Sequence, residues 1–309
     1  MWLNRFSKFL LHKRLPALIL VFAISFVPII NSLSLMIVVL VTLVKGVLDG
    51  AFFLLATLIP ALIIFWFRFH GGTLPTMLLI SAVIAMVSMI ATWIFAIMLR
   101  EQKNWKNILQ LSALAGVLIV SVVHLAYPHI ADWWAVQLST INEQFSLNLP
   151  AKSTTKTQLL TQQTEFINAT KAYATGMVMV VLLLKAWSML MMGRWWQGSI
   201  SGVPILRSEL YELRLNGLAG IFFIVAVIFW NLGNPVVLDI MPILYLLFGM
   251  AGLCLVHYLF NMSRTSMTIF WMSLFYIMII LSLPTSAMVI SLIALLDSLF
   301  NIRNRIKKV

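Results

Sequence analysis

Long uncharged stretches dominate the chain and predict its architecture. Eight of them lie between charged residues, at positions 15–44, 51–67, 71–99, 107–131, 172–184, 215–238, 240–263 and 265–296. An α-helix rises about 1.5 Å per residue, so roughly 20 apolar residues cross a hydrocarbon core of about 30 Å. Most stretches are therefore predicted to form one membrane-spanning helix each, and the predicted fold class is all-α, a polytopic transmembrane helical bundle.

The first and last stretches are about half as long again as a single span needs. Each contains residues that interrupt a helix, Pro28 with Asn31 in the first and Pro284 in the last. Proline removes a backbone donor, and asparagine competes for backbone hydrogen bonds. Each stretch is therefore expected to fold as a pair of shorter helices.

Basic residues at the ends of the stretches bear on this expectation, because Lys and Arg in short loops mark the cytoplasmic side. They form five groups: Arg5, Lys8, Lys13 and Arg14; Arg100, Lys103 and Lys106; Arg194, Arg207 and Arg214; Arg264; and Arg303, Arg305, Lys307 and Lys308. All are cytoplasmic only if an even number of crossings separates each neighbouring pair of groups. Splitting both long stretches satisfies this condition and predicts about ten membrane segments, with both termini cytoplasmic. Re-entrant hairpins at the two ends would keep the same parity with about eight full crossings.

Composition narrows the class of protein further. Of the 309 residues, 62% are hydrophobic and only 10% are charged, whereas a soluble surface needs many more charges. The net charge of +12 is like that of a nucleic-acid-binding protein, but the positive residues lie at the ends of apolar stretches, as membrane anchors do. Cys254 is the single cysteine, which excludes an internal disulfide and a thiolate metal cluster. We predict one integral domain of a bacterial inner membrane, 1–309, whose partner is the lipid bilayer and not nucleic acid.

Three segments lie outside the apolar stretches. Residues 1–14 alternate apolar and basic side chains at helical spacing, which predicts a helix at the cytoplasmic interface. A cleavable signal peptide is less favoured, because the apolar stretch that follows is too long for its hydrophobic region. Residues 128–171 form a periplasmic insertion, for which an amphipathic helix and a flexible loop both remain open. Residues 194–214 form an amphipathic cytoplasmic loop.

Ionisable side chains within the apolar stretches are the first functional candidates, because an unpaired charge in hydrocarbon costs several kcal/mol. Lys185 and Asp297 are predicted at matched depth near the cytoplasmic side, so we consider a buried pair. A structural role for this pair is favoured over a proton or substrate relay, and Lys185 could instead extend alone to the interface. Asp239 is expected in an outward turn beside Gly233 and Pro235, where a solvated carboxylate is favoured over a site for a cation or a ligand amine.

Histidines provide little support for a metal site. His124 and His129 lie close to Asp132, but their spacing does not align both rings on one helix face. They are interpreted as polar anchors at the interface, and His257 as a hydrogen-bonded packing residue. The sequence contains no nucleotide-binding loop, zinc motif or catalytic triad. We therefore expect no catalytic residues, no metal, no cofactor and no enzymatic activity.

The most distinctive segment is 194–214. Its tryptophan pair suits the headgroup layer at the end of a span. Beyond a flexible link, Leu206, Leu210 and Leu213 share one face of a predicted short interfacial helix. A docking site for a membrane or cytoplasmic protein partner is the alternative interpretation, with the candidate residues Arg194, Trp195, Trp196, Arg207, Glu209, Glu212 and Arg214.

At this segment the chain resembles the bacterial YybS-like membrane-protein family, which is defined as a domain of unknown function. The resemblance is carried by GRWWQ at 193–197, RSELYELRL at 207–215 and LDSLFNIR at 296–303, and in organisation it covers nearly the whole chain. The family is distantly similar to the substrate-binding subunits of energy-coupling-factor vitamin transporters. Those subunits dock their partner through an Ala-x-x-x-Ala face on the first helix. Here Ala17 is followed four positions later by Val21, so that motif is absent at the expected place.

Two functional hypotheses of different classes follow. The first is a small-molecule transport or substrate-binding membrane subunit without its own ATPase, with a binding cavity between helices. The alternative is a non-transporting scaffold or assembly factor that docks a partner through residues 194–214. A third hypothesis, an intramembrane enzyme acting on lipid, would need acid and base groups at one depth, and the sequence does not indicate them.

Overall fold

The computed structural model describes residues 2–27, 30–69, 76–146, 153–263 and 267–306. All regular secondary structure in these ranges is helical, as the apolar pattern predicts. The helices are α1 (Trp2–His12), α2 (Arg14–Ser25), α3 (Asn31–Val44), α4 (Val47–Phe69), α5 (Thr76–Arg100), α6 (Trp105–Ala126), α7 (Ile130–Ser146), α8 (Ser153–Thr170), a 3-10 turn (Lys171–Tyr173), α9 (Ala174–Ser201), α10 (Ile205–Tyr211), α11 (Gly217–Asn231), α12 (Pro235–Ser263), α13 (Thr268–Leu281), α14 (Leu283–Phe300) and α15 (Ile302–Ile306).

The lengths and surfaces of these helices are those of a membrane protein. In the described residues, five helices are long and apolar enough to cross a membrane, namely α4, α5, α6, α9 and α12; shorter apolar helices are α2, α3, α11, α13 and α14. Large apolar side chains also cover the outside of the bundle. Leu125 is 83% exposed, Ile269 82% and Leu281 81%. Exposed apolar surface on this scale is stable in hydrocarbon and not in water.

Both long terminal stretches are split into helix pairs, as predicted. The first divides into α2 and α3, and its Pro28 lies outside the described residues. The last divides into α13 and α14 at Ser282, and Pro284 occupies the first turn of α14. Proline is tolerated there because the first amides of a helix have no partner within the helix.

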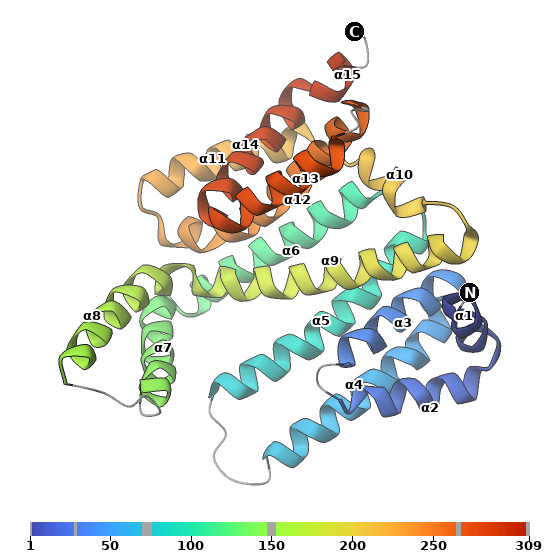
Figure 1. The fold of residues 1–309 in the computed structure, drawn as a ribbon. Helices are drawn as coiled ribbons and strands as arrows, with labels where there is room; N and C mark the ends of the chain where they lie inside the picture. Colours follow the sequence, from blue (N-terminus) through green and yellow to red (C-terminus); the bar gives the residue numbers. More distant parts are fainter. Residues whose placement is uncertain (1, 28–29, 70–75, 147–152, 264–266, 307–309) are drawn as a thin grey trace.

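Helix α9 runs through the middle of the bundle, with α1–α5 on one side and α11–α15 on the other (Figure 1). The larger apolar core joins α5, α6, α9, α11 and α12 and contains the fully buried Trp187 and Phe248. Trp187 Nε1 donates to Ser112 Oγ at 3.0 Å, which satisfies the buried indole. A second core joins α2, α3 and α4 around Phe53.

The turn between α11 and α12 lies earlier than the charge pattern predicts. We expected Asp239 in this turn, but the turn occupies Leu232–Asn234 and Asp239 lies inside α12. Gly233 adopts a left-handed conformation (φ 74°), and Asn234 Oδ1 accepts the amide protons of Val236 and Val237. This asparagine cap, followed by Pro235 at the first helical position, starts α12 ahead of the aspartate.

The segments outside the apolar stretches are also helical. The predicted helix in residues 1–14 is α1. The 128–171 insertion, for which helix and loop were both open, contains α7 and α8, while residues 147–152 lie outside the described ranges. Helix α10 contains Leu206 and Leu210 of the predicted short interfacial helix. It ends at Tyr211, so Leu213 lies beyond it.

Candidate functional site

Basic helix ends gather at one end of the bundle, called here the basic face because it carries Arg14, Arg100, Arg194, Arg214 and Arg303. Arg14 at the start of α2 pairs with Asp49 at the start of α4, with 3.1 Å between nitrogen and oxygen. Arg100 at the end of α5 donates from Nη1 to the carbonyl oxygens of Thr42 and Leu43, at 3.1 and 3.0 Å. The contacts therefore bring together helix ends whose basic residues the charge pattern assigns to one side.

Both terminal helices lie at the basic face. Trp196, near the end of α9, donates from Nε1 to Ser7 Oγ of α1 at 2.9 Å. Arg303 of α15 donates from Nη1 to the carbonyl oxygen of Tyr211, at the end of α10. Three of the predicted basic markers, Arg264, Lys307 and Lys308, lie outside the described residues.

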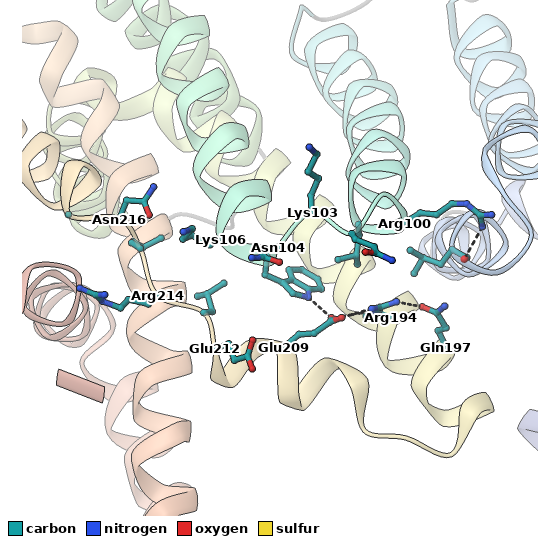
Figure 2. A pocket seen from close by; sticks show the side chains of 17 residues that line it. Arg100, Lys103, Asn104, Lys106, Arg194, Gln197, Glu209, Glu212, Arg214 and Asn216 are labelled. Carbon is teal, nitrogen blue, oxygen red and sulfur yellow. Dashed lines mark hydrogen bonds and ion pairs between the residues drawn. The ribbon is translucent and has the colours of Figure 1, made fainter. Parts of the chain in front are cut away.

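A cavity of about 820 Å³ opens at the basic face, between the ends of α5 and α9, the start of α6, helix α10 and the start of α11 (Figure 2). We call it the basic cavity. Five cationic and two anionic side chains line it, which gives the lining a net formal charge of +3. Its polar lining consists of Arg100, Gln102, Lys103, Asn104, Lys106, Arg194, Gln197, Glu209, Glu212, Arg214 and Asn216.

One ion pair closes one wall of the basic cavity. Glu209 of α10 pairs with Arg194 of α9, and its Oε2 also accepts the indole proton of Trp105 at 2.8 Å. Arg194 further donates to Gln197 Oε1. Figure 2 shows Arg194 and Gln197 of α9 meeting Glu209 of α10. The carboxylate of Glu209 is therefore satisfied by contacts within the protein, and these contacts fix α10 against α6 and α9.

The remaining cations are not neutralised by carboxylates. Arg214 donates to the carbonyl oxygens of Asp297 and Ser298, both at 2.9 Å, and so points away from Arg100 toward α14 (Figure 2). Lys103 and Lys106 have no carboxylate within 4.0 Å in the part of the chain that the structure describes. The carbonyls that bind Arg100 and Arg214 belong to the last turns of α3 and α14, whose partial negative charge offsets part of each arginine charge. The positive potential of the basic cavity therefore comes mainly from Lys103 and Lys106.

Two helix N-termini add to this potential. Helix α6 begins at Trp105 after Asn104, and α11 begins at Gly217 after Asn216, and all four residues line the basic cavity. Neither asparagine caps its helix through a side-chain hydrogen bond. The first amides of a helix carry partial positive charge and attract anions. The arrangement can therefore bind an anion, with side-chain and backbone donors on several sides.

The predicted interface residues of 194–214 are used largely within the protein. Arg194 and Glu209 pair with each other, Arg214 binds α14, and Arg207 donates to Tyr211 Oη and Asn261 Oδ1. Trp196 is 2% exposed and stacks on Phe6, with ring centroids 5.9 Å apart. Trp195, Arg207 and Glu212 are exposed. Sequence reasoning used Lys106 only to mark topology, noted Gln197 only as part of the GRWWQ motif, and missed Trp105, which gave no signal of its own.

The proposed Lys185–Asp297 pair is wrong, because Asp297 has a different partner. Asp297 Oδ2 accepts from Arg303 Nε at 3.1 Å, and both side chains are buried. Asn301 takes a left-handed conformation (φ 53°) at the end of α14, which turns the chain so that Arg303 folds back onto the aspartate. Lys185 is half-buried in α9, and no carboxylate of the described residues lies within 4.0 Å of it.

Asp239 is also placed differently from the solvated turn position we expected. It is 2% exposed, and its Oδ2 lies 3.0 Å from His124 Nε2 at the end of α6. Its Oδ1 accepts the backbone proton of Gly176 at 2.6 Å. We call these three residues the outer cluster, because they lie at the end of α6, α9 and α12 opposite the basic face. The carboxylate is buried because two neighbouring helices supply its partners.

The described histidines outside the outer cluster do not form a metal centre. His129 Nδ1 lies 3.8 Å from Asp132 Oδ2 on an exposed surface, and His257 bonds to Tyr276 Oη as the packing interpretation expects. Within the described ranges, no three His, Cys, Asp or Glu side chains are grouped so that they could hold a metal ion. Comparisons of the chain with protein-family models, curated proteins and solved structures find no match. The resemblance to the YybS-like family therefore stays a prediction.

Proposed function

We propose that the protein is a small-molecule transport or substrate-binding subunit of a bacterial inner membrane, without its own ATPase, and that its ligand is a small anion bound in the basic cavity. The observation that carries this proposal is the charge of the basic cavity, whose lining has a net formal charge of +3 around a volume of about 820 Å³. That volume is in the range of small-molecule pockets, roughly 300–1,000 Å³. Uncompensated positive charge in a concave site raises the local concentration of anions.

The orientation follows from the charge rule. Lys and Arg concentrate at the basic face, so we assign it to the cytoplasm, with both termini on that side and about eight to ten membrane segments in all. Helices α2 and α3 have 12 and 14 residues, which correspond to about 18 and 21 Å. Both are shorter than the hydrocarbon core, so they form a re-entrant hairpin in this proposal. Reporter fusions at the two termini test the orientation, and a periplasmic signal at either end would contradict it.

Anion binding is better supported than partner docking through 194–214. Docking needs side chains that are free to contact a partner, whereas most candidates in this segment contact the protein itself. Trp195, Arg207 and Glu212 are the exposed members, and Arg207 already donates to Tyr211 and Asn261. The docking alternative predicts a single co-purifying protein that is lost in the Trp195→Ala variant while the cavity residues remain intact.

Thermal stability in the presence of defined anions tests the binding proposal. The full-length protein in detergent is heated with pyrophosphate, ATP, citrate or the neutral compound glucose. A ligand present at 100 times its Kd adds about 2.7 kcal/mol to stability. We expect at least one anion to raise the melting temperature, glucose to leave it unchanged, and added salt to weaken the effect.

A matched pair of lysine variants locates the effect. Lys106→Gln removes a cation from the basic cavity, and Lys13→Gln removes an exposed cation outside it. We expect the first to reduce the anion-dependent shift and the second to preserve it. Equal shifts in both variants and the wild type would place the anion elsewhere, and no shift with any anion would contradict the proposed function.

A further inference from the structure

A second hollow lies on the other side of α10. This lateral groove of about 680 Å³ runs between the end of α9, helix α10 and the last turns of α12. Its apolar wall includes Val203, Ile205, Leu206 and Leu210. Helix α10 thus separates two different surfaces, since Glu209 and Glu212 face the basic cavity while Leu206 and Leu210 line the groove.

The groove is partly open and lies near the ends of α9 and α12, where the predicted orientation places the lipid headgroups. Trp195 is 56% exposed and Val203 54% exposed, and both line it. His257, another lining residue, lies six residues before Ser263, the last residue of α12. Exposed tryptophan is typical of the boundary between hydrocarbon and headgroups. In the proposed orientation, the apolar wall therefore lies at the boundary between acyl chains and headgroups.

One charge marks the polar end of the lateral groove. Arg207 is exposed, and its Nε and Nη2 donate to Tyr211 Oη and Asn261 Oδ1, each at 2.7 Å. Both acceptors are neutral, and Arg207 forms no ion pair with any residue that the structure describes. The guanidinium is thus held in a fixed orientation with its charge uncompensated. Arginine in such a position is suited to a phosphate group.

We propose that the lateral groove binds one anionic phospholipid, with its phosphate on Arg207 and an acyl chain along Leu206 and Leu210. A soluble phosphate compound is excluded as the occupant, because it would leave the apolar wall exposed. A zwitterionic phospholipid fits less well, because its own cationic group offsets the charge that Arg207 requires. The site is separate from the basic cavity, so it does not depend on the proposed transport function.

Lipid retention measured by native mass spectrometry tests this proposal. The full-length protein is reconstituted in nanodiscs of equimolar phosphatidylglycerol and phosphatidylcholine and then released for analysis. We expect one retained phosphatidylglycerol on the wild type. Arg207→Gln should weaken retention about tenfold, which corresponds to about 1.4 kcal/mol, the scale of one charge-assisted hydrogen bond. Glycerol 3-phosphate should not compete, because it has no acyl chain.

Control variants separate the site from general surface charge and shape. Arg305→Gln removes an exposed arginine of α15 at the same face and should retain lipid like the wild type. Val203→Trp fills the groove and should reduce retention, whereas Val44→Trp, at an exposed position outside the groove, should not. Equal retention of the two lipids by the wild type, or equal phosphatidylglycerol retention by the Arg207 and Arg305 variants, would overturn the proposal. Loss of anion binding in the basic cavity with lipid retention unchanged would contradict only the proposed function.

Discussion

His124 Nε2 lies 3.0 Å from Asp239 Oδ2, although the two residues are 115 positions apart in the sequence. Their side chains are 9% and 3% exposed, and the second carboxylate oxygen of Asp239 accepts the Gly176 amide proton. The outer cluster thus joins α6, α9 and α12 at the end opposite the basic cavity. These are three of the long helices of the bundle, so we expect the outer cluster to stabilise the packing of α6, α9 and α12.

The first prediction concerns the histidine of the outer cluster. His124→Ala removes one partner of a buried carboxylate, and such a loss costs about 3–5 kcal/mol when the remaining charge cannot reach water. We expect a lower melting temperature in detergent by intrinsic fluorescence. His129→Ala is the control, since that side chain is 91% exposed and should change stability by less than about 0.5 kcal/mol. Equal effects of the two variants would mean that His124 does not support Asp239.

The second prediction concerns the glycine of the outer cluster. A Cβ at Gly176 would overlap the backbone carbonyl oxygen of Asp239, so α9 could not approach α12 as closely as it does. Gly176→Ala should therefore destabilise the protein by more than about 1 kcal/mol, although alanine is the better helix former. Gly217→Ala adds a methyl group where the nearest atom, Ser298 O, is 3.9 Å away, so it should be neutral or stabilising. The same unfolding measurement on both variants compares them directly, and a neutral Gly176→Ala would contradict the close approach.

The third prediction distinguishes the two partners considered for Asp297. Double-mutant cycles compare Asp297→Asn with Arg303→Gln and with Lys185→Gln. Residues in direct contact couple by about 0.5–3 kcal/mol, whereas separated residues add within about 0.5 kcal/mol. We expect coupling with Arg303 and additivity with Lys185, measured by thermal unfolding. Coupling with Lys185 alone would restore the pairing inferred from matched depth.

The sequence predicted the features of the fold that follow from hydropathy and from helix-breaking residues. Apolar stretches gave the helices, and the breakers Asn31 and Pro284 correctly indicated that the terminal stretches divide. The parity of the basic residues anticipated that their helix ends share a face, which the contacts of Arg14 and Arg100 bear out. The membrane side of that face and the number of full crossings stay predictions.

The sites were less accessible from sequence because they join distant segments. Depth along a helix suggested Lys185 for Asp297, but the left-handed Asn301 turned Arg303 onto it instead. Asp239 looked solvated because its nearest neighbours in sequence are turn residues. Its actual partners come from two other helices, and no periodicity reports such a contact. The basic cavity could not be predicted for the same reason. Its lining comes from the ends of several helices, and a single residue such as Lys106 does not indicate a cavity.

Cysteine protection tests the central claim most directly, namely that the basic cavity faces the cytoplasm and binds an anion. Cys254 is replaced by alanine, and Asn104→Cys then places the only thiol at the cavity wall. A membrane-impermeant maleimide is applied to inside-out and right-side-out vesicles, with and without pyrophosphate. The account predicts labelling only in inside-out vesicles, slowed by pyrophosphate and not by glucose. Labelling from the periplasmic side, or labelling that no anion slows, would contradict it.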